Sequence, residues 1–259
     1  YNAGKSPQKE DTFLNILVVN DDGIQSPGLA CLARVAARLG RVWVVAPAQQ
    51  CSAMSHRITV FGSLELRAAP DFPVSEVEAW TVSGTPADCV KVALDRVLPQ
   101  KPDLVLSGVN QGYNVGLDIL YSGTVGATME ALANGLRAMA VSIGMGDDYR
   151  VIDARLPDIL RSLLPRPIEP WEIWNINFPA CAPEELRGTR EGCWPSALQF
   201  YHNTYRPTEL EDGGIRLELT STIEQNPEPG SDMDAVLRNY IAIGKISSAM
   251  LEAAHRARN

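Results

Sequence analysis

A short apolar run followed by two aspartates limits the fold of this chain more than any other feature. Residues 15–19 read Asn-Ile-Leu-Val-Val, and the turn-forming sequence Asn-Asp-Asp-Gly follows at residues 20–23. A run of this kind, rich in β-branched residues, is typical of a strand that is buried on both faces of a parallel sheet. We therefore expect a parallel sheet that helices cover on both sides.

The residues that follow complete a strand–helix–strand unit. Apolar side chains recur at helical spacing from Leu29 to Leu39, and Gly40 is expected to end the helix. Residues 41–46, Arg-Val-Trp-Val-Val-Ala, predict a second buried strand. Because two parallel strands joined by a helix almost always form a right-handed crossover, residues 15–46 begin a wound α/β sheet.

The same alternation continues along most of the chain. Further strands are expected at residues 58–60, 64–66, 80–83, 102–107, 138–143 and 171–178, and helices at 85–98, 124–136 and 152–164. Beyond residue 179 the pattern predicts a hairpin (198–205 and 215–221), a short helix capped by Ser231 or Asp232, a strand (240–243) and a helix (246–258). The predicted fold class is α/β, a Rossmann-like three-layer αβα core with a mostly parallel, doubly wound sheet and a C-terminal hairpin and helix extension.

The same pattern suggests three divisions of the chain. Residues 1–12 are polar and begin with Tyr, so we expect a disordered or artificial extension there. Residues 13–180 are expected to form the catalytic core. Residues 181–259 are expected to form an extension that partly rejoins the core and serves oligomerisation; the alternative is that its hairpin folds back on its own domain.

The composition excludes several classes of protein and partner. The 259 residues include 31 acidic and 23 basic side chains, which give a formal net charge of −8. Such a chain repels polyanions, so we expect neither a nucleic-acid polymer nor a membrane as a partner. No segment reaches the ~18 consecutive apolar residues of a membrane span. The five cysteines contain no C-x-x-C pair, which favours reduced thiols and a cytoplasmic location over disulfides or a zinc site.

Polar side chains follow three of the predicted strands. Asp21 and Asp22 follow the first strand, Ser52 follows the second, and Asn110 lies in a glycine-rich run at residues 108–116. Ligands of open α/β sheets bind outside the carboxyl ends of the strands, so these residues are expected at one crevice. Their oxygen atoms suit Mg²⁺ or Mn²⁺ better than Zn²⁺. The alternative for the aspartates is a turn or a helix cap; the helix that follows weakens the hairpin-turn reading.

Candidate phosphate ligands lie in the same loops and at a helix start. They are Asn20, Gly112, Asn114, Ser122, Gly123 and Thr124. Backbone N–H groups there can hold an anion, although loop glycines and simple N-capping by Ser122 or Thr124 explain the same residues. His56 is the only histidine near these loops and ranks second as a general acid or base, because an ordinary hydrogen-bonded role is more common.

Linked segments of the chain resemble the SurE (survival protein E) nucleotidase family. The segments are residues 16–28 (ILVVNDDGIQSPG), 44–47 with Ser52, 84–89 (GTPADC), 107–116 (SGVNQGYNVG), 121–124 (YSGT), 175–179 (NINFP) and Ser231-Asp232 with Ala235-Val236. The resemblance implies one divalent ion per subunit, Mg²⁺ or Mn²⁺, held by Asp21, Asp22, Ser52 and Asn110. It also implies a homodimer or homotetramer formed through the C-terminal extension.

The function implied is hydrolysis of nucleoside 5′-monophosphates, with Asp21 and Asp22 as the catalytic residues. Nucleoside 3′-monophosphates and short polyphosphate are further candidate substrates. The nucleophile stays open between a metal-bound water and an aspartate. A non-catalytic nucleotide-binding or regulatory module on the same fold is the alternative function. An NAD-dependent oxidoreductase is disfavoured, since no G-x-G-x-x-G sequence follows the first strand.

Overall fold

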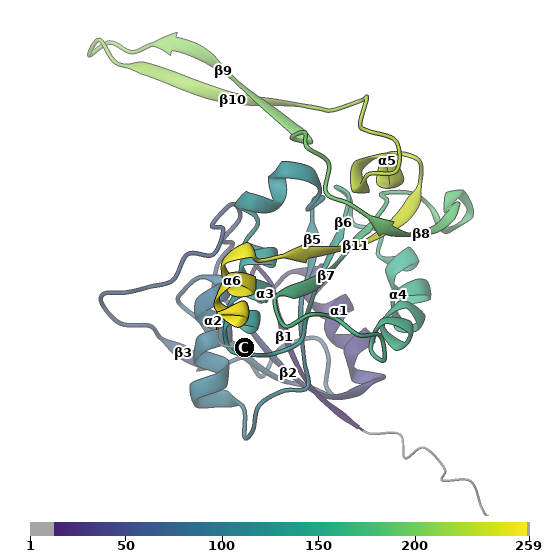
Figure 1. Ribbon diagram of the computed structural model, residues 1–259. Coiled ribbons are helices and arrows are strands. Elements are labelled where there is room, and N and C mark those ends of the chain that lie inside the picture. Colours follow the sequence, from purple (N-terminus) through teal and green to yellow (C-terminus); the bar gives the residue numbers. More distant parts are fainter. Residues whose placement is uncertain (1–12, 258–259) are drawn as a thin grey trace, which may run out of the picture.

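A nine-stranded sheet forms the centre of the protein, as the computed structural model of residues 13–257 shows (Figure 1). Its strands, in spatial order, are β3 (Leu66–Ala68), β4 (Glu78–Val82), β2 (Gly40–Pro47), β1 (Leu14–Val19), β5 (Leu104–Gln111), β6 (Ala138–Ile143), β7 (Glu172–Phe178), β11 (Tyr240–Ser247) and β8 (Gly188–Cys193). The α-helices are α1 (Pro27–Ala37), α2 (Pro86–Val92), α3 (Gly123–Ala133), α4 (Arg150–Leu163), α5 (Asp232–Leu237) and α6 (Ala249–Arg256). Short helical turns of other types are η1 (Ala93–Val97), η2 (Gly116–Tyr121) and η3 (Pro183–Glu185).

The direction of winding changes beside β1. Strands β2 and β5 both pair with β1 in parallel, so successive units of the chain extend the sheet in opposite directions from it. Only β3 beside β4 and β11 beside β7 pair antiparallel within this sheet. The change of direction opens a crevice at the carboxyl ends of β1 and β5, where open α/β sheets bind their ligands.

Two apolar layers pack on opposite faces of the sheet. Alternate residues of β1 enter different clusters, Ile16 and Val18 on the side of α1 and α4, Leu17 and Val19 on the side of α2 and α3. Figure 1 shows α6 near α2 and α3, and Leu251 of α6 packs against their cluster. The sheet is therefore buried on both faces, which explains the continuous apolar character of its central strands.

A two-stranded hairpin, β9 (Tyr201–Glu209) with β10 (Ile215–Ile223), projects away from this body (Figure 1). All nine residues of β10 are exposed. Its apolar residues alternate with polar ones, so Leu217 and Leu219 lie on the same face, opposite Pro207 and Tyr205 of β9. The hairpin thus has an apolar face that the described part of this chain leaves open.

The observed architecture confirms the predicted α/β class and corrects several elements. Residues 58–60 form no strand, because Thr59 uses its backbone N–H to bind the Asp88 carboxylate at 2.9 Å. Strand β5 continues to Gln111, into the glycine-rich run that was expected to be a loop. Residues 246–247 belong to β11, so the last helix begins later than expected. Strand β8 was not predicted, and it forms by pairing with β11.

The remaining expectations concern the ends of the chain and the membrane. The extension predicted at residues 1–12, and the predicted end of the last helix at residue 258, lie outside the described residues. Within residues 13–257, none of the helices combines the length and apolar character that a membrane span requires.

Candidate active site

The carboxylates of Asp21 and Asp22 lie where the chain leaves β1. Asp21 is 3% exposed, and its Oδ1 accepts a hydrogen bond of 2.6 Å from the Thr124 hydroxyl. Asp22 is half-buried, and its Oδ2 accepts a bond of 3.1 Å from the backbone N–H of Gln111. Burial raises the pKa of Asp21 to about 6, although the hydrogen bond from Thr124 acts to lower it. The negative charge of Asp22 also raises the pKa of Asp21. Burial raises the pKa of Asp22 as well.

The loop after β2 and the end of β5 bring Ser52 and Asn110 to the same edge. Ser52 follows β2, and the backbone N–H of Cys51 beside it donates to the Asp21 carbonyl at 2.7 Å. Asn110 lies near the end of β5, where its Nδ2 donates to the Gly112 carbonyl at 2.8 Å. The pairing of β1 with both β2 and β5 therefore places these residues around one point.

A cavity of about 690 Å³ opens at this point. It is lined by six of the predicted site residues, Asp21, Ser52, Asn110, Gly112, Asn114 and Ser122. Asp22 is not part of the lining, and it reaches the cavity wall through its bond to Gln111. The base of the hairpin supplies a second wall through Tyr201, Asn203 and Tyr205.

Helix α3 begins at the cavity and carries three predicted phosphate ligands. Ser122 is its N-cap, and the Ser122 hydroxyl accepts the backbone N–H of Val125 at 3.1 Å. Thr124 is fully buried and binds Asp21 instead of lining the cavity. Gly123 lies against Asp21, because a Cβ atom placed there would stand 2.9 Å from the Asp21 Oδ2 atom. The N-capping expected as the simpler explanation is therefore present at Ser122.

A network of buried amides fixes Asn114 on the cavity wall. Its Nδ2 donates to the Ser142 hydroxyl at 2.8 Å, and its backbone N–H donates to Asn177 Oδ1 at 2.9 Å. Its carbonyl accepts bonds from the side chains of Asn175 and Asn177 at 2.9 and 3.0 Å. These bonds hold the loop after β5 in a single position, since breaking them would leave buried polar groups unpaired.

The two remaining predicted residues lie away from the cavity. Asn20 is fully buried beneath the aspartates, with its Nδ2 bound to the Gly23 carbonyl at 3.0 Å. His56 does not line the cavity, and its Nε2 lies 2.9 Å from Glu130 Oε2 on α3. Sequence reasoning did not single out Glu130, whose position 74 residues from His56 gives no local signal.

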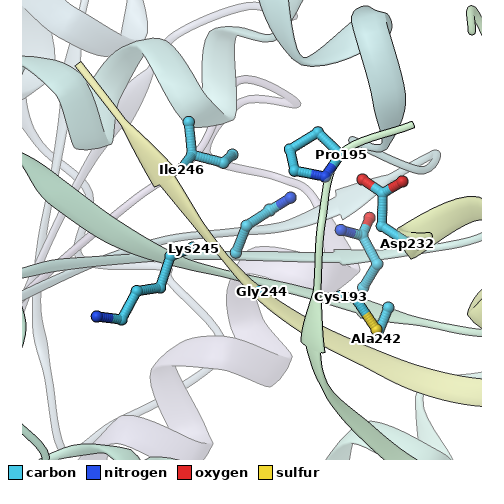
Figure 2. Close-up of a pocket in the computed structure, with 9 residues that line it drawn as sticks. Cys193, Pro195, Asp232, Ala242, Gly244, Lys245 and Ile246 are labelled. Atoms are coloured by element: carbon cyan, nitrogen blue, oxygen red, sulfur yellow. The ribbon is translucent and has the colours of Figure 1, made fainter. Parts of the chain in front are cut away.

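Asp232 of the C-terminal extension also reaches the loop after β5. Its Oδ2 accepts the backbone N–H of Gly116 at 2.9 Å, and its Oδ1 accepts that of Ser196 at 3.0 Å. Figure 2 shows its carboxylate beside a small cavity, whereas the side chain of Lys245 points away from it. Burial raises the pKa of Asp232 to about 6 despite these bonds. The sequence predicts only a helix-capping role for Ser231 or Asp232, and Ser231 is indeed the N-cap of α5, whereas the contact of Asp232 with Gly116 was not predicted.

Comparison with known proteins identifies the family of this chain. The family model described as "Survival protein SurE" matches residues 16–198, which include all four predicted metal ligands. The chain belongs to the SurE family. One relative, named 5′-nucleotidase SurE, from Synechococcus sp. (strain JA-3-3Ab), is 36% identical over 236 residues, which cover 89% of this chain and 90% of that protein.

Other SurE proteins match over a similar length. A 5′-nucleotidase SurE from Thermosipho africanus (strain TCF52B) is 36% identical over 241 residues, 90% of this chain and 91% of the relative. The crystal structure of the SurE protein from Aquifex aeolicus superimposes with a TM-score of 0.76 at 30% identity. That match covers 95% of this chain and all of the Aquifex chain, so the SurE likeness extends beyond the residues of the family model.

Proposed function

We propose that this SurE protein hydrolyses nucleoside 5′-monophosphates in a reaction that depends on a divalent metal ion. The observation that carries the proposal is the meeting of Asp21, Ser52 and Asn110 at one cavity beside the reversal of strand order. The names of the SurE relatives supply the substrate class. A binding module without turnover is the alternative, and the experiment below separates the two.

The residues at this edge fit a hard divalent cation, Mg²⁺ or Mn²⁺, at one ion per subunit. Among the described residues, neither Asp21 nor Asp22 forms an ion pair with a basic side chain, so their charges are not balanced within the chain. Two neighbouring carboxylates whose pKa values are raised by burial are stabilised by a cation. Within residues 13–257 no three His, Cys, Asp or Glu side chains gather into a metal site, so the proposed site rests on two carboxylates together with hydroxyl and amide oxygens. The donor set is carboxylate, hydroxyl and amide, which is typical of Mg²⁺ or Mn²⁺.

The two aspartates have defined roles in the proposed reaction. When bound, a divalent cation would neutralise phosphate oxygens and acidify a water molecule. Thr124 and the Gln111 backbone hold the two carboxylates by one oxygen each, at Oδ1 of Asp21 and Oδ2 of Asp22. An aspartate that takes a proton from the attacking water, or attacks phosphorus itself, is compatible with this placement.

The cavity wall offers groups for the phosphate and the nucleoside. Gly112, Asn114 and Ser122 line the cavity, and Ser122 is the N-cap of α3, a helix start of the kind whose free backbone N–H groups can bind an anion. Tyr121 and Tyr205 provide aromatic surface in the lining of the same cavity. We propose that the phosphate binds near Ser122 and that the nucleoside extends toward the tyrosines.

Phosphate release from adenosine 5′-monophosphate tests this function. We expect no release in chelator and full recovery when Mg²⁺ or Mn²⁺ is restored, with parallel reactions on a 3′-monophosphate and short polyphosphate to define the substrate range. Full activity in chelator would overturn the metal dependence. Saturable nucleotide binding without phosphate release under any metal would favour the binding module.

We further propose that the hairpin joins two or more copies of this chain into a homodimer or homotetramer. Its apolar face includes Leu217 and Leu219, which are 58% and 60% exposed, and Tyr205, which is 61% exposed. An exposed apolar face of this kind is typical of an oligomer interface. Light scattering of the purified protein tests the proposal, and a monomer at micromolar concentration would contradict it.

The proposed division of the chain and its location rest on the sequence. We propose a catalytic core at residues 13–180 and an extension at 181–259 that oligomerises, since the hairpin lies in the second part. We propose a cytoplasmic location because five cysteines without a C-x-x-C pair suit a reducing compartment. Fractionation of cells that make the protein tests the location.

A further inference from the structure

The Ser52 loop, residues 48–63, contains neither helix nor strand, yet it carries a proposed metal ligand. A loop of this length is commonly mobile unless specific contacts hold it. The backbone N–H of Cys51, next to Ser52, donates to the Asp21 carbonyl. The position of Ser52 relative to Asp21 therefore depends on what holds the rest of the loop.

Ser55 ties the middle of the Ser52 loop to the residues before α3. Its backbone N–H donates to the Tyr121 carbonyl at 3.0 Å, and its hydroxyl donates to the Leu120 carbonyl at 2.8 Å. Ser55 has a φ of +52°, a left-handed conformation that costs energy in a residue with a side chain. The two bonds compensate for that cost, so the loop is held at Ser55 by contacts outside itself.

Gly126 lets the backbone of the Ser52 loop lie directly on α3. A Cβ atom at residue 126 would stand 2.1 Å from the Ser55 carbonyl oxygen and 3.0 Å from the His56 nitrogen. These distances leave no room for any side chain, so only glycine allows the close approach. Helix α3 thus acts as a support against which the loop backbone rests.

His56 holds the loop to the same face of α3 one turn further on. Its Nε2 lies 2.9 Å from Oε2 of Glu130, whose side chain is 9% exposed. Glu130 also binds Lys91 at 3.4 Å and Asn134 at 3.0 Å. Burial would raise the pKa of Glu130, but the bond with His56 and the charge of Lys91 lower it below its usual value. Glu130 is therefore a charged acceptor for His56.

We propose that Gly126, Glu130 and His56 form a seat that fixes Ser52 relative to Asp21 for metal binding. The first turn of α3 already orients Asp21 through Thr124, so one helix sets the positions of ligands from two separate loops. His56 is then a positioning residue, because it lies outside the cavity and acts through the loop. The inference rests on the proposed function, in which Ser52 is a metal ligand.

The test is a double-mutant cycle on Mn²⁺ affinity, measured by electron paramagnetic resonance of the full-length protein. We compare His56→Ala, Ser52→Ala and the double variant with the wild type. We expect His56→Ala to weaken Mn²⁺ binding about tenfold, the size of an outer-shell effect. In the Ser52→Ala background the same change should add nothing, because the ligand that it positions is already absent.

Two further variants separate positioning from general damage. His202→Ala is the matched control, since His202 also binds a glutamate, Glu224 at 3.0 Å, and is 44% exposed against 41% for His56. It should leave Mn²⁺ affinity unchanged. His56→Gln keeps a donor for Glu130 and should restore part of the affinity that His56→Ala loses.

The outcomes distinguish the seat from the proposed function. If His56→Ala weakened Mn²⁺ binding equally in the wild-type and Ser52→Ala proteins, or in neither, the proposed role of the seat would be wrong. Mn²⁺ binding by the wild type would still support the proposed function. Should the wild type bind no Mn²⁺, the proposed function itself would be overturned. If His56→Ala lowered the melting temperature, Glu130→Gln in the same cycle gives the second measurement, because it keeps the size of the side chain and removes its charge, and additive losses there would also reject the seat.

Discussion

The central strands and the projecting hairpin have the same backbone geometry and opposite surroundings. The last four residues of β1 are buried, whereas all nine residues of β10 are exposed. Helices cover both faces of β1, and no element in the described part of this chain covers the apolar face of β10. The difference indicates that β1 contributes folding stability, while the exposed hairpin is available for the contacts with substrate and with another chain that we propose.

Substitution of Asp21, at the end of β1, should have the largest effect of those considered. It should lower the activity and raise the stability of the protein. Asp21→Asn should lower phosphate release by a few hundredfold or more, as expected for a group that stabilises the reacting charge. In chelator the variant should be more stable than the wild type by about 1–3 kcal/mol, because it removes a buried carboxylate whose pKa is raised to about 6. Denaturant unfolding at neutral pH measures this, and a less stable variant would contradict the account.

Paired truncations would compare the two regions directly. Leu106 on β5 is fully buried and Leu219 on β10 is 60% exposed. Leu106→Ala should cost about 2–5 kcal/mol of unfolding free energy, and Leu219→Ala less than about 0.5 kcal/mol in the monomer. Urea denaturation at low protein concentration measures both. Light scattering should show weaker self-association for Leu219→Ala only. Equal losses of unfolding free energy in the two variants would contradict the difference between the central strands and the hairpin.

Asp232 joins the segment after β5 to the segment before the hairpin, and it should make stability depend on pH. Burial raises its pKa from 3.8 to about 6 in the folded protein, so folding favours the protonated form. Its contribution is fully present below about pH 4 and is lost as pH rises through about 6. The difference in unfolding free energy between wild type and Asp232→Asn should shift by roughly 1–3 kcal/mol across this range. Parallel pH profiles of the two proteins would argue against this explanation.

The smallest expected effect concerns the hairpin wall of the cavity. Tyr205→Ala should raise the KM for a nucleoside monophosphate about fivefold and leave kcat nearly unchanged, since it removes uniform binding surface. Thr204→Ala is the control, because its side chain points to the other face of β9 and bonds to Thr220. A kcat loss at Tyr205, or an equal KM change at Thr204, would place the effect elsewhere.

Much of the sheet could be predicted from local patterns, because its strands are buried on both faces. The apolar run of β1 and the helical spacing in α1 are visible in a few residues. Strand β8, with the sequence GTREGC, has no such pattern and exists because it pairs with β11. Residues 58–60 contain β-branched side chains, but the bonds from Thr59 to Asp88 hold them in an irregular loop.

Some residues of the candidate site could likewise be predicted from local sequence, and others could not. Asp21, Asp22, Ser52 and Asn110 could be proposed because each follows a predicted strand of a wound sheet. Glu130 and Asp232 could not, because their partners lie 74 and 116 residues away. Contacts that position a site are made between distant segments, and a single sequence carries no signal for them.

Titration of Mn²⁺ into wild type and Asp22→Asn, followed by electron paramagnetic resonance, tests the central claim most directly. The account predicts one ion per chain in the wild type, at least a tenfold weaker site in the variant and a matching loss of phosphate release. Unchanged binding of one ion by Asp22→Asn, with wild-type phosphate release, would contradict the assignment of the metal to the carboxyl end of β1.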